Sequence, residues 1–284
     1  MWLHKHAEEF LKPSLRILAL LSLFFALPTV AAELQKKTST AYDHYVQLTE
    51  ARIAGEMGDG NSFLWVDRQP EPRRKELLSL LAKGQVVVQH METRESGKEI
   101  PIPDGMVHHW MATVFVPGVD LQQTLSLMQD FERHTEIYKA DVVKAKVLNH
   151  KGDDFQLYLR LHRKTVVTVV YDTQFDIKFF PVDKTREYSR HCATRIVEVE
   201  NAGRSDEHED PVGNDRGFLW RLNTYWRYQE KNGGTYIQVE FITLSRSVPS
   251  IFAWLVNPYI KSIPHEYLTN LLQTTRSALT AKKS

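Results

Sequence analysis

The stretch RLNTYWRYQEKNGGTYIQVEF, residues Arg221–Phe241, contains two runs of alternating apolar and polar residues on either side of Asn232-Gly233-Gly234. Alternation with a period of two is typical of β-strands that bury one face. Asn-Gly between two such runs is a strong signal for a hairpin turn. The stretch therefore predicts an antiparallel hairpin with one face in the core.

The alternation assigns the side chains of this hairpin to two faces. We expect the apolar face to point inward, because burying each Trp or Phe contributes roughly 2–3 kcal/mol. Its residues are Phe218, Trp220, Leu222, Thr224, Trp226, Tyr228, Ile237, Val239, Phe241 and Thr243. Matching like with like across the turn places Asn223 opposite Glu240 and Tyr225 opposite Gln238.

The other face of the hairpin is polar, and three interpretations of it stay open. Its residues Arg221, Asn223, Tyr225 and Glu240 could orient a ligand in a cavity, which requires Arg221 and Glu240 to pair because unpaired buried charges are unfavourable. The face could instead be solvated, or be covered by residues 33–104. Arg227 belongs to this face, and its replacement by alanine is expected to have only a small surface effect.

The segments around the hairpin predict an α+β fold. VHHWMATVFV (107–116) reads as a strand, and Asp120 with Gln123 forms a capping-box pattern before two short helices. About six β-strands with turn residues between them follow. After Pro264, the apolar stripe Leu268, Leu271, Leu272, Thr275 and Leu279 predicts a long amphipathic helix.

This order resembles the helix-grip architecture of the START-like (SRPBCC) superfamily. HHWMATVFVPGVDLQQTLSLMQDFERHTEIYKADVVKAKVL is similar to the opening strand, helix pair and return strand of that family. ITLSRSVPSIFAWLVNPYI, followed by Pro264, is similar to the entry into its final helix. The resemblance extends to exported bacterial START-like proteins of unassigned activity. It implies a curved antiparallel sheet of about six to seven strands wrapped around the C-terminal helix, with a cavity between them.

The N-terminus has the pattern of an export signal. Lys5 and Lys12 precede a thirteen-residue apolar run, Leu15–Leu27, and small residues follow up to Ala32. The run is shorter than the roughly 20 residues that span a bilayer. We expect a cleaved signal peptide (1–32), a helical extension with one strand (33–104) and a START-like domain (105–284). The exported protein would be periplasmic or secreted; an uncleaved membrane anchor is the alternative.

Composition and motifs exclude several function classes. The net charge is +1, and no basic cluster indicates a nucleic-acid partner. Cys192 is the single cysteine and reads as structural, and His108 and His109 point to opposite strand faces. The acidic residues 206–210 read as a solvated loop. The sequence predicts no catalytic nucleophile, no metal site and no cofactor.

The expected function is binding or carrying a lipid or another hydrophobic small molecule. The cavity face would consist of Trp110, Trp220, Leu222, Thr224, Trp226, Phe241, Leu268 and Leu272. Transient membrane contact would accompany lipid exchange. One alternative is a cyclase- or dehydratase-like enzyme that uses the polar residues; another is a partner-binding protein with a filled core. The sequence makes no prediction of ligand identity or oligomeric state.

Overall fold

Strand alternation over the middle of the chain produces one large antiparallel sheet. The computed structural model describes residues 32–58, 62–164, 168–247 and 250–281, and in the last helix it describes side chains from residue 264 onward. Residues Ala32–Ser284 form one compact unit. The expected signal segment, apart from its last residue, lies outside the described residues.

The sheet has nine strands in the described part of the chain, which exceeds the number expected from the sequence. Eight follow the order β2-β5-β13-β12-β9-β8-β7-β6, and β10 pairs with β9. The bounds are β2 (Val87–His90), β5 (Gly105–Pro117), β6 (Val142–Lys151), β7 (Asp154–Lys164), β8 (Thr168–Asp183), β9 (Arg186–Glu200), β10 (His208–Glu209), β12 (Arg221–Lys231) and β13 (Gly234–Arg246).

The extra strands are β2 and β10. β2 was expected as a strand of the N-terminal extension, but it pairs with β5 and covers backbone groups that an edge strand would expose. Two further strand pairs lie outside the sheet. They are β1 (Ala32–Glu33) with β11 (Asn214–Asp215), and β3 (Arg94–Glu95) with β4 (Lys98–Glu99).

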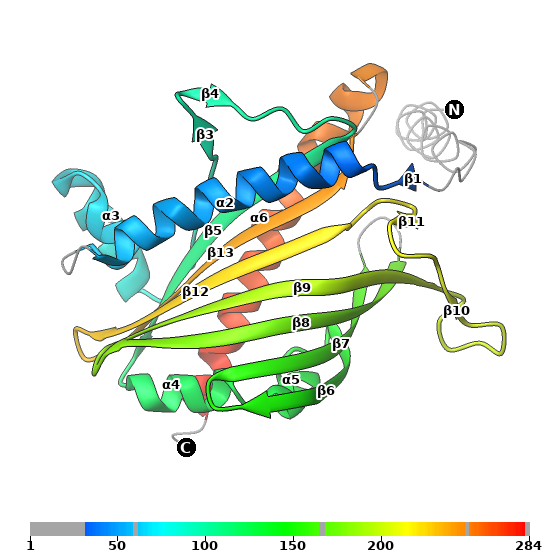
Figure 1. Cartoon of the computed structure of the whole chain (residues 1–284). Coiled ribbons are helices and arrows are strands. Elements are labelled where there is room, and N and C mark those ends of the chain that lie inside the picture. The colour runs from blue at the N-terminus through cyan, green and yellow to red at the C-terminus, as the bar shows by residue number, and fades with distance from the viewer. Residues whose placement is uncertain (1–31, 59–61, 165–167, 248–249, 282–284) are drawn as a thin grey trace, which may run out of the picture. The chain divides into compact units, whose positions relative to one another are not determined.

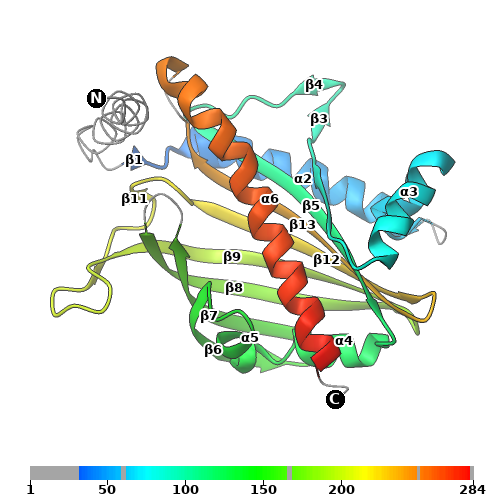
Figure 2. The same cartoon turned by 180° about the vertical axis from the view of Figure 1, so that it is seen from behind.

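The long helix α6 (Ser250–Ala281) crosses one face of the sheet, here called the inner face (Figure 2). Leu268, Leu272 and Leu279 are buried against it, as the apolar stripe predicts, while Leu271 is half-buried. The predicted capping box of Asp120 and Gln123 begins α4 (Leu121–Met128). The second predicted helix is a 3-10 turn, η2 (Phe131–Arg133), followed by the single turn α5 (His134–Ile137). This arrangement is the predicted helix-grip fold.

The N-terminal helix α2 (Lys36–Gly58) crosses the opposite face, here called the outer face (Figure 1). The 3-10 turn η1 (Trp65–Arg68) and α3 (Glu71–Ala82) follow it. The buried side of α2 has no leucine stripe; four of its six residues carry a hydroxyl group, and the six are Thr38, Tyr42, Tyr45, Val46, Thr49 and Ile53. The helix therefore brings polar groups to the sheet.

The central hairpin has the predicted faces but a different register. Tyr225 lies opposite Glu240 and Asn223 opposite Ile242, so the predicted pairing was wrong by two residues. The turn consists of Asn232 and Gly233 alone, both at positive φ (58° and 73°), as a two-residue hairpin turn requires. A shift of two preserves the faces because side chains alternate with a period of two.

Among the described residues, no helix has the length and apolar character that crossing a membrane requires.

Candidate functional site

Seven of the eight residues expected to line a cavity lie on the inner face. Phe241 is in register with Trp110 on one side and Thr224 on the other. Its ring contacts Tyr267 of α6 at 5.8 Å between centroids. The same apolar cluster contains Leu222, Trp226, Leu268 and Leu272. These side chains lie between the sheet and α6.

Trp220 does not lie with them. It precedes β12, so the strand alternation does not extend to it. Its indole N–H donates to Asp215 Oδ1 at 3.1 Å, and its ring packs in the outer cluster with Tyr42 and Tyr45. The assignment of Trp220 to the cavity face was therefore wrong.

The inner face also carries polar groups within its apolar surroundings, here called the inner polar cluster. They are Glu187, Ser189 and His191 from β9, Tyr228 from β12 and His134 from α5. Cross-strand pairing sets Glu187 beside Tyr228 and Ser189 beside Trp226. Ser189 Oγ lies 3.0 Å from His191 Nε2.

Aromatic contacts connect this cluster across the interior. The rings of Phe131 and Phe155 lead from His134 to Phe179, and Phe179 contacts His191. From His191 the contacts continue through Trp226 to Tyr228. The polar groups thus belong to one continuous aromatic layer that β-strands, α5 and η2 build together.

Burial keeps both histidines neutral. It lowers the pKa of His191 to about 3, with the charge of His134 acting in the same direction. Burial also lowers the pKa of His134 to about 4, while Asp130 and hydrogen bonds with the backbone of Met128 and Leu127 oppose the shift. At neutral pH each imidazole therefore has one N–H donor and one nitrogen acceptor.

Two polar atoms of the cluster have no hydrogen-bond partner among the described residues. They are His134 Nε2 and the Tyr228 hydroxyl, and both are buried. Burial raises the pKa of Tyr228 far above its usual value, and the nearby Ser189 hydroxyl acts in the opposite direction without reaching hydrogen-bond geometry. Buried polar groups without partners are rare in proteins, and each one calls for an explanation such as a bound molecule.

Glu187 is the titratable acid of the cluster. Its side chain is only 5% exposed. Burial, together with the charge of Asp153, raises its pKa to about 7. A carboxyl group with a pKa near neutrality can exchange protons at physiological pH.

The residues Arg221, Asn223, Tyr225 and Glu240 lie on the outer face, under or beside α2. The Tyr225 hydroxyl donates to Glu50 of α2 at 2.9 Å, and Tyr42 donates to Asn223 Oδ1 at 2.9 Å. Glu240 contacts Arg52 and His109, not Arg221. The interpretation of these residues as a polar cluster that faces the cavity was wrong. Instead, residues 33–104 cover this face of the hairpin, which was one of the alternatives.

The outer face is held by a buried ion network. Arg227, 1% exposed, donates to Glu56 Oε2 at 2.6 Å and to the carbonyl of Phe63 at 2.8 Å. Glu56 also contacts Arg52 and Arg68. Although burial opposes it, hydrogen bonds from Arg68 and Arg227 lower the pKa of Glu56 to about 2. Arg227 is therefore not the surface residue that the sequence predicted.

A relay of hydrogen bonds joins the network to α2. The hydroxyl of Tyr45 accepts from the N–H of Thr93 at 2.8 Å, and its oxygen lies 2.8 Å from His109 Nδ1. His109 Nε2 is 2.6 Å from Glu240 Oε1. His108, by contrast, contacts Ser245, so the two adjacent histidines face opposite sides as expected.

A pocket of about 440 Å³ lies between α2 and the outer face. Arg190, Cys192, Arg221 and Asn223 line its sheet side, and Glu50 lies on its helix side. Cys192 is half-buried and accepts a hydrogen bond from the Asn223 amide at 3.2 Å. Arg190 pairs with Glu50 at 2.8 Å. The pocket is an opening within the α2 interface.

Sequence reasoning missed most of the inner polar cluster. Glu187, Ser189 and His191 alternate along EYSRHCATR, and three polar residues on one strand face normally indicate a solvated face. The opposite face of this stretch carries Tyr188, Arg190 and Cys192, so polarity does not distinguish its two faces. His134 lies in a short helix whose direction the sequence does not determine.

No protein-family model matches the chain, and no curated protein matches its sequence. Among solved structures, a STAR-related lipid transfer protein from Xanthomonas axonopodis is 14% identical, with a TM-score of 0.43 over 68% of this chain and 98% of that one. The Zhui aromatase/cyclase from a Streptomyces species is 9% identical, with a TM-score of 0.45 over 63% of this chain and 97% of that one. Human STARD10 is 10% identical, with a TM-score of 0.41 over 79% and 83%. The structural neighbours of this chain are thus START/SRPBCC proteins at low sequence identity.

Proposed function

We propose that the protein binds a lipid or another apolar small molecule that carries a polar group, in the interior between the sheet and α6. The observation that carries the proposal is the pair of buried, unpartnered atoms His134 Nε2 and Tyr228 Oη inside an apolar layer. An apolar ligand body would contact the aromatic side chains. Its polar group would satisfy one or both of these atoms.

Burial lowers the pKa of His134 to about 4, so the ring is neutral and its Nε2 either donates or accepts one hydrogen bond. The Tyr228 hydroxyl can also donate or accept. A ligand group that both donates and accepts, such as a hydroxyl or an amide, would satisfy either atom. The ligand expected is therefore an alcohol, amide or similar neutral polar lipid.

Displacement of a fluorescent probe tests this proposal. The probe is N-phenyl-1-naphthylamine, and the competitors are dodecan-1-ol and dodecane. Wild type should bind the probe and prefer the alcohol, and Tyr228→Phe should reduce that preference about fivefold, since one hydrogen bond contributes roughly 1 kcal/mol. Tyr158→Phe is the matched control, because Tyr158 bonds Asp172 away from the cluster. Failure of folded wild type to bind any apolar probe would contradict the proposal.

An acid–base enzyme is the second candidate, and Glu187 favours it. Its pKa of about 7 and its position beside Tyr228 provide a proton donor and acceptor within the same interior. Wild type and Glu187→Gln should be purified from the same host, and their bound molecules compared by native mass spectrometry. An enzyme would hold substrate in the variant and product, or nothing, in wild type. A carrier would hold the same molecule in both.

The proposal includes export and membrane contact. The apolar run Leu15–Leu27 and the small residues up to Ala32 support cleavage before Glu33. Intact mass of the protein from its host would test this, because retention of residues 1–32 would indicate an anchor.

Lipid collection would involve transient contact with a membrane, measurable as transfer of a labelled lipid between vesicles.

A further inference from the structure

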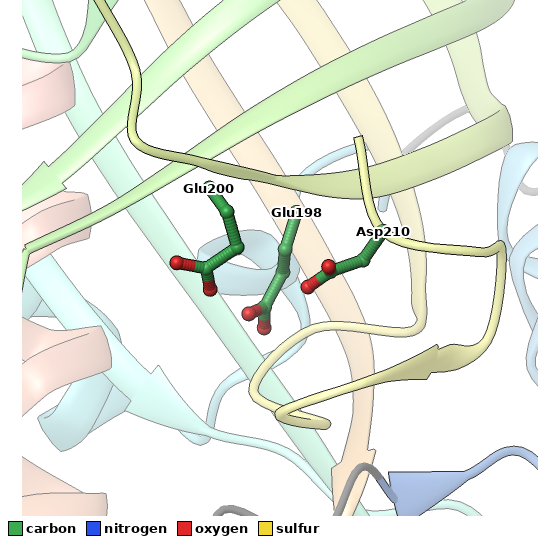
Figure 3. Close-up of side chains that lie close together, drawn as sticks. All are labelled: Glu198, Glu200 and Asp210. Atoms are coloured by element: carbon green, nitrogen blue, oxygen red, sulfur yellow. The ribbon is translucent and has the colours of Figure 1, made fainter. Parts of the chain in front are cut away.

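Three carboxylates converge at the end of β9, outside the inner polar cluster. Glu198 and Glu200 belong to β9 and Asp210 to the segment after β10, and one oxygen of each lies within 4.8 Å of the others. Figure 3 shows the three side chains close together, with the carboxylate of Asp210 directed toward Glu198. The N–H of Asp210 donates to the carbonyl of Glu198 at 2.9 Å, which fixes the segment beside the strand.

The burial of Glu198 is a second observation that favours a ligand at this place. Its side chain is fully buried, and its Oε1 has no hydrogen-bond partner among the described residues. Oε2 accepts from Arg216 Nε at 2.6 Å. A buried carboxylate oxygen without a partner is unfavourable, because it has lost its hydrogen bonds to water and no protein group replaces them. An ion that contacts Oε1 would offset this desolvation cost.

The charges at this place do not balance. Arg216 contacts Glu198 and, at 3.4 Å, Glu200, and contributes one positive charge against three carboxylates. Asp215 lies next in the chain, is 3% exposed and leaves its Oδ2 without a partner among the described residues. Carboxylates at such separations repel one another, and a divalent cation would offset the repulsion.

We propose that Glu198, Glu200 and Asp210 bind a calcium ion. The three residues offer only carboxylate oxygens, which are the ligands of hard cations. Calcium–oxygen distances are about 2.3–2.6 Å, so ligands on opposite sides of the ion are up to about 5 Å apart. Magnesium requires about 2.0–2.1 Å and a near-ideal octahedron, which this spread of oxygens fits less well.

The ion would join two parts of the chain. β9 belongs to the sheet, while Asp210 lies in the connection between β10 and β11, and β11 pairs with β1 at the start of the described chain. Calcium would thereby fasten this connection to the sheet. The sequence analysis interpreted residues 206–210 as a solvated loop, and the proposed site combines one of them, Asp210, with two carboxylates of the preceding strand.

Terbium luminescence tests the proposal directly. Tb³⁺ takes calcium sites, and Trp220 is a nearby sensitiser because its indole bonds Asp215. The full chain should give a Trp-sensitised Tb³⁺ signal that Ca²⁺ displaces, with a Kd on the order of 10⁻⁴–10⁻³ M, the range of exposed calcium modules. Isothermal titration with Ca²⁺ alone provides the stoichiometry, expected to be one ion per chain.

Matched carboxylate-to-amide variants locate the ion. Glu200→Gln and Asp210→Asn, which leave the buried Glu198–Arg216 pair intact, should each weaken Ca²⁺ binding at least tenfold. Glu209→Gln, next to Asp210 but paired with Arg195, should bind as wild type does. Circular dichroism verifies folding, and the half-exposed Glu200 provides the safer of the two variants.

Absence of binding by folded wild type at about 10 mM Ca²⁺, which is about ten times the upper Kd expected, would overturn the proposal. So would unchanged binding in both Glu200→Gln and Asp210→Asn. Competition by Mg²⁺ at the same concentrations as Ca²⁺ would overturn the assignment to calcium.

Discussion

The two faces of the sheet hold buried polar groups in opposite ways. On the outer face they are charged and paired: Arg227 with Glu56, and Glu240 with Arg52 and His109. On the inner face, burial lowers the pKa of His191 to about 3, which keeps it neutral, and raises the pKa of Glu187 to about 7. The outer face has therefore completed its contacts through α2, whereas the inner face keeps hydrogen-bonding capacity. That difference is what distinguishes a structural interface from a candidate binding site.

Removal of Arg227 should give the largest effect on stability. Arg227→Ala would leave Glu56 and the carbonyl of Phe63 without their partner, and breaking a buried ion pair in this way costs about 3–5 kcal/mol. Denaturant unfolding measures the loss. Arg195→Ala removes a more exposed arginine paired with Glu209 and should change stability by less than about 1 kcal/mol. A loss below about 1 kcal/mol for Arg227→Ala would show that the ion network does not hold α2.

Leu272→Ala tests the apolar packing of the inner face. Leu272 is fully buried on α6, so its truncation should cost about 2–5 kcal/mol, depending on how far the site collapses. The exposed Leu148 on β6 provides a control, with an expected change within about 0.5 kcal/mol. Equal, small effects in the two variants would mean that α6 does not grip the sheet.

More of the fold than of the candidate site could be predicted from the sequence. Alternation in β12 and β13, the Asn232-Gly233 turn and the stripe containing Leu268 and Leu272 depend on local periods, which sequence displays directly. The partners of Arg227 and Glu240 come from α2, from Phe63 and from His109 on β5, so their pairing depends on long-range packing. Likewise, Glu187, Ser189 and His191 look like a solvated face until α6 and α5 cover them. Convergence of distant residues has no local signature.

The pH dependence of stability should differ between the faces, and Glu187 isolates the inner contribution. Its pKa is raised to about 7 in the folded protein. A raised carboxyl pKa favours folding at low pH, and this contribution is lost as the pH rises from about 4.5 to about 7. Glu187→Gln should therefore be more stable than wild type by about 3 kcal/mol above pH 7, and the difference should vanish near pH 4.5.

Glu56 provides the opposite sign on the outer face. Its pKa is lowered to about 2, so its contribution is present above about pH 4.5 and is lost as the pH falls toward 2. Unfolding of wild type, Glu187→Gln and Glu56→Gln across pH 2–9 measures both. A Glu187→Gln difference that is independent of pH would indicate that Glu187 does not titrate near neutrality.

The smallest effect should come from two matched Tyr→Phe changes. The Tyr45 hydroxyl contacts Thr93 N–H and His109 Nδ1 on the outer face, so Tyr45→Phe should destabilise the protein by about 1–2 kcal/mol. The Tyr228 hydroxyl has no partner among the described residues, so Tyr228→Phe should be neutral or stabilising by up to about 1 kcal/mol. Both changes retain a buried ring and remove one oxygen, which makes them comparable.

Denaturant unfolding of ligand-free protein measures the two changes in stability, since a bound ligand would add its own stabilisation to wild type. A loss in Tyr228→Phe as large as that in Tyr45→Phe would mean that the inner hydroxyl is satisfied within the protein, and the inner face would then lack the open hydrogen-bonding capacity on which the binding proposal depends.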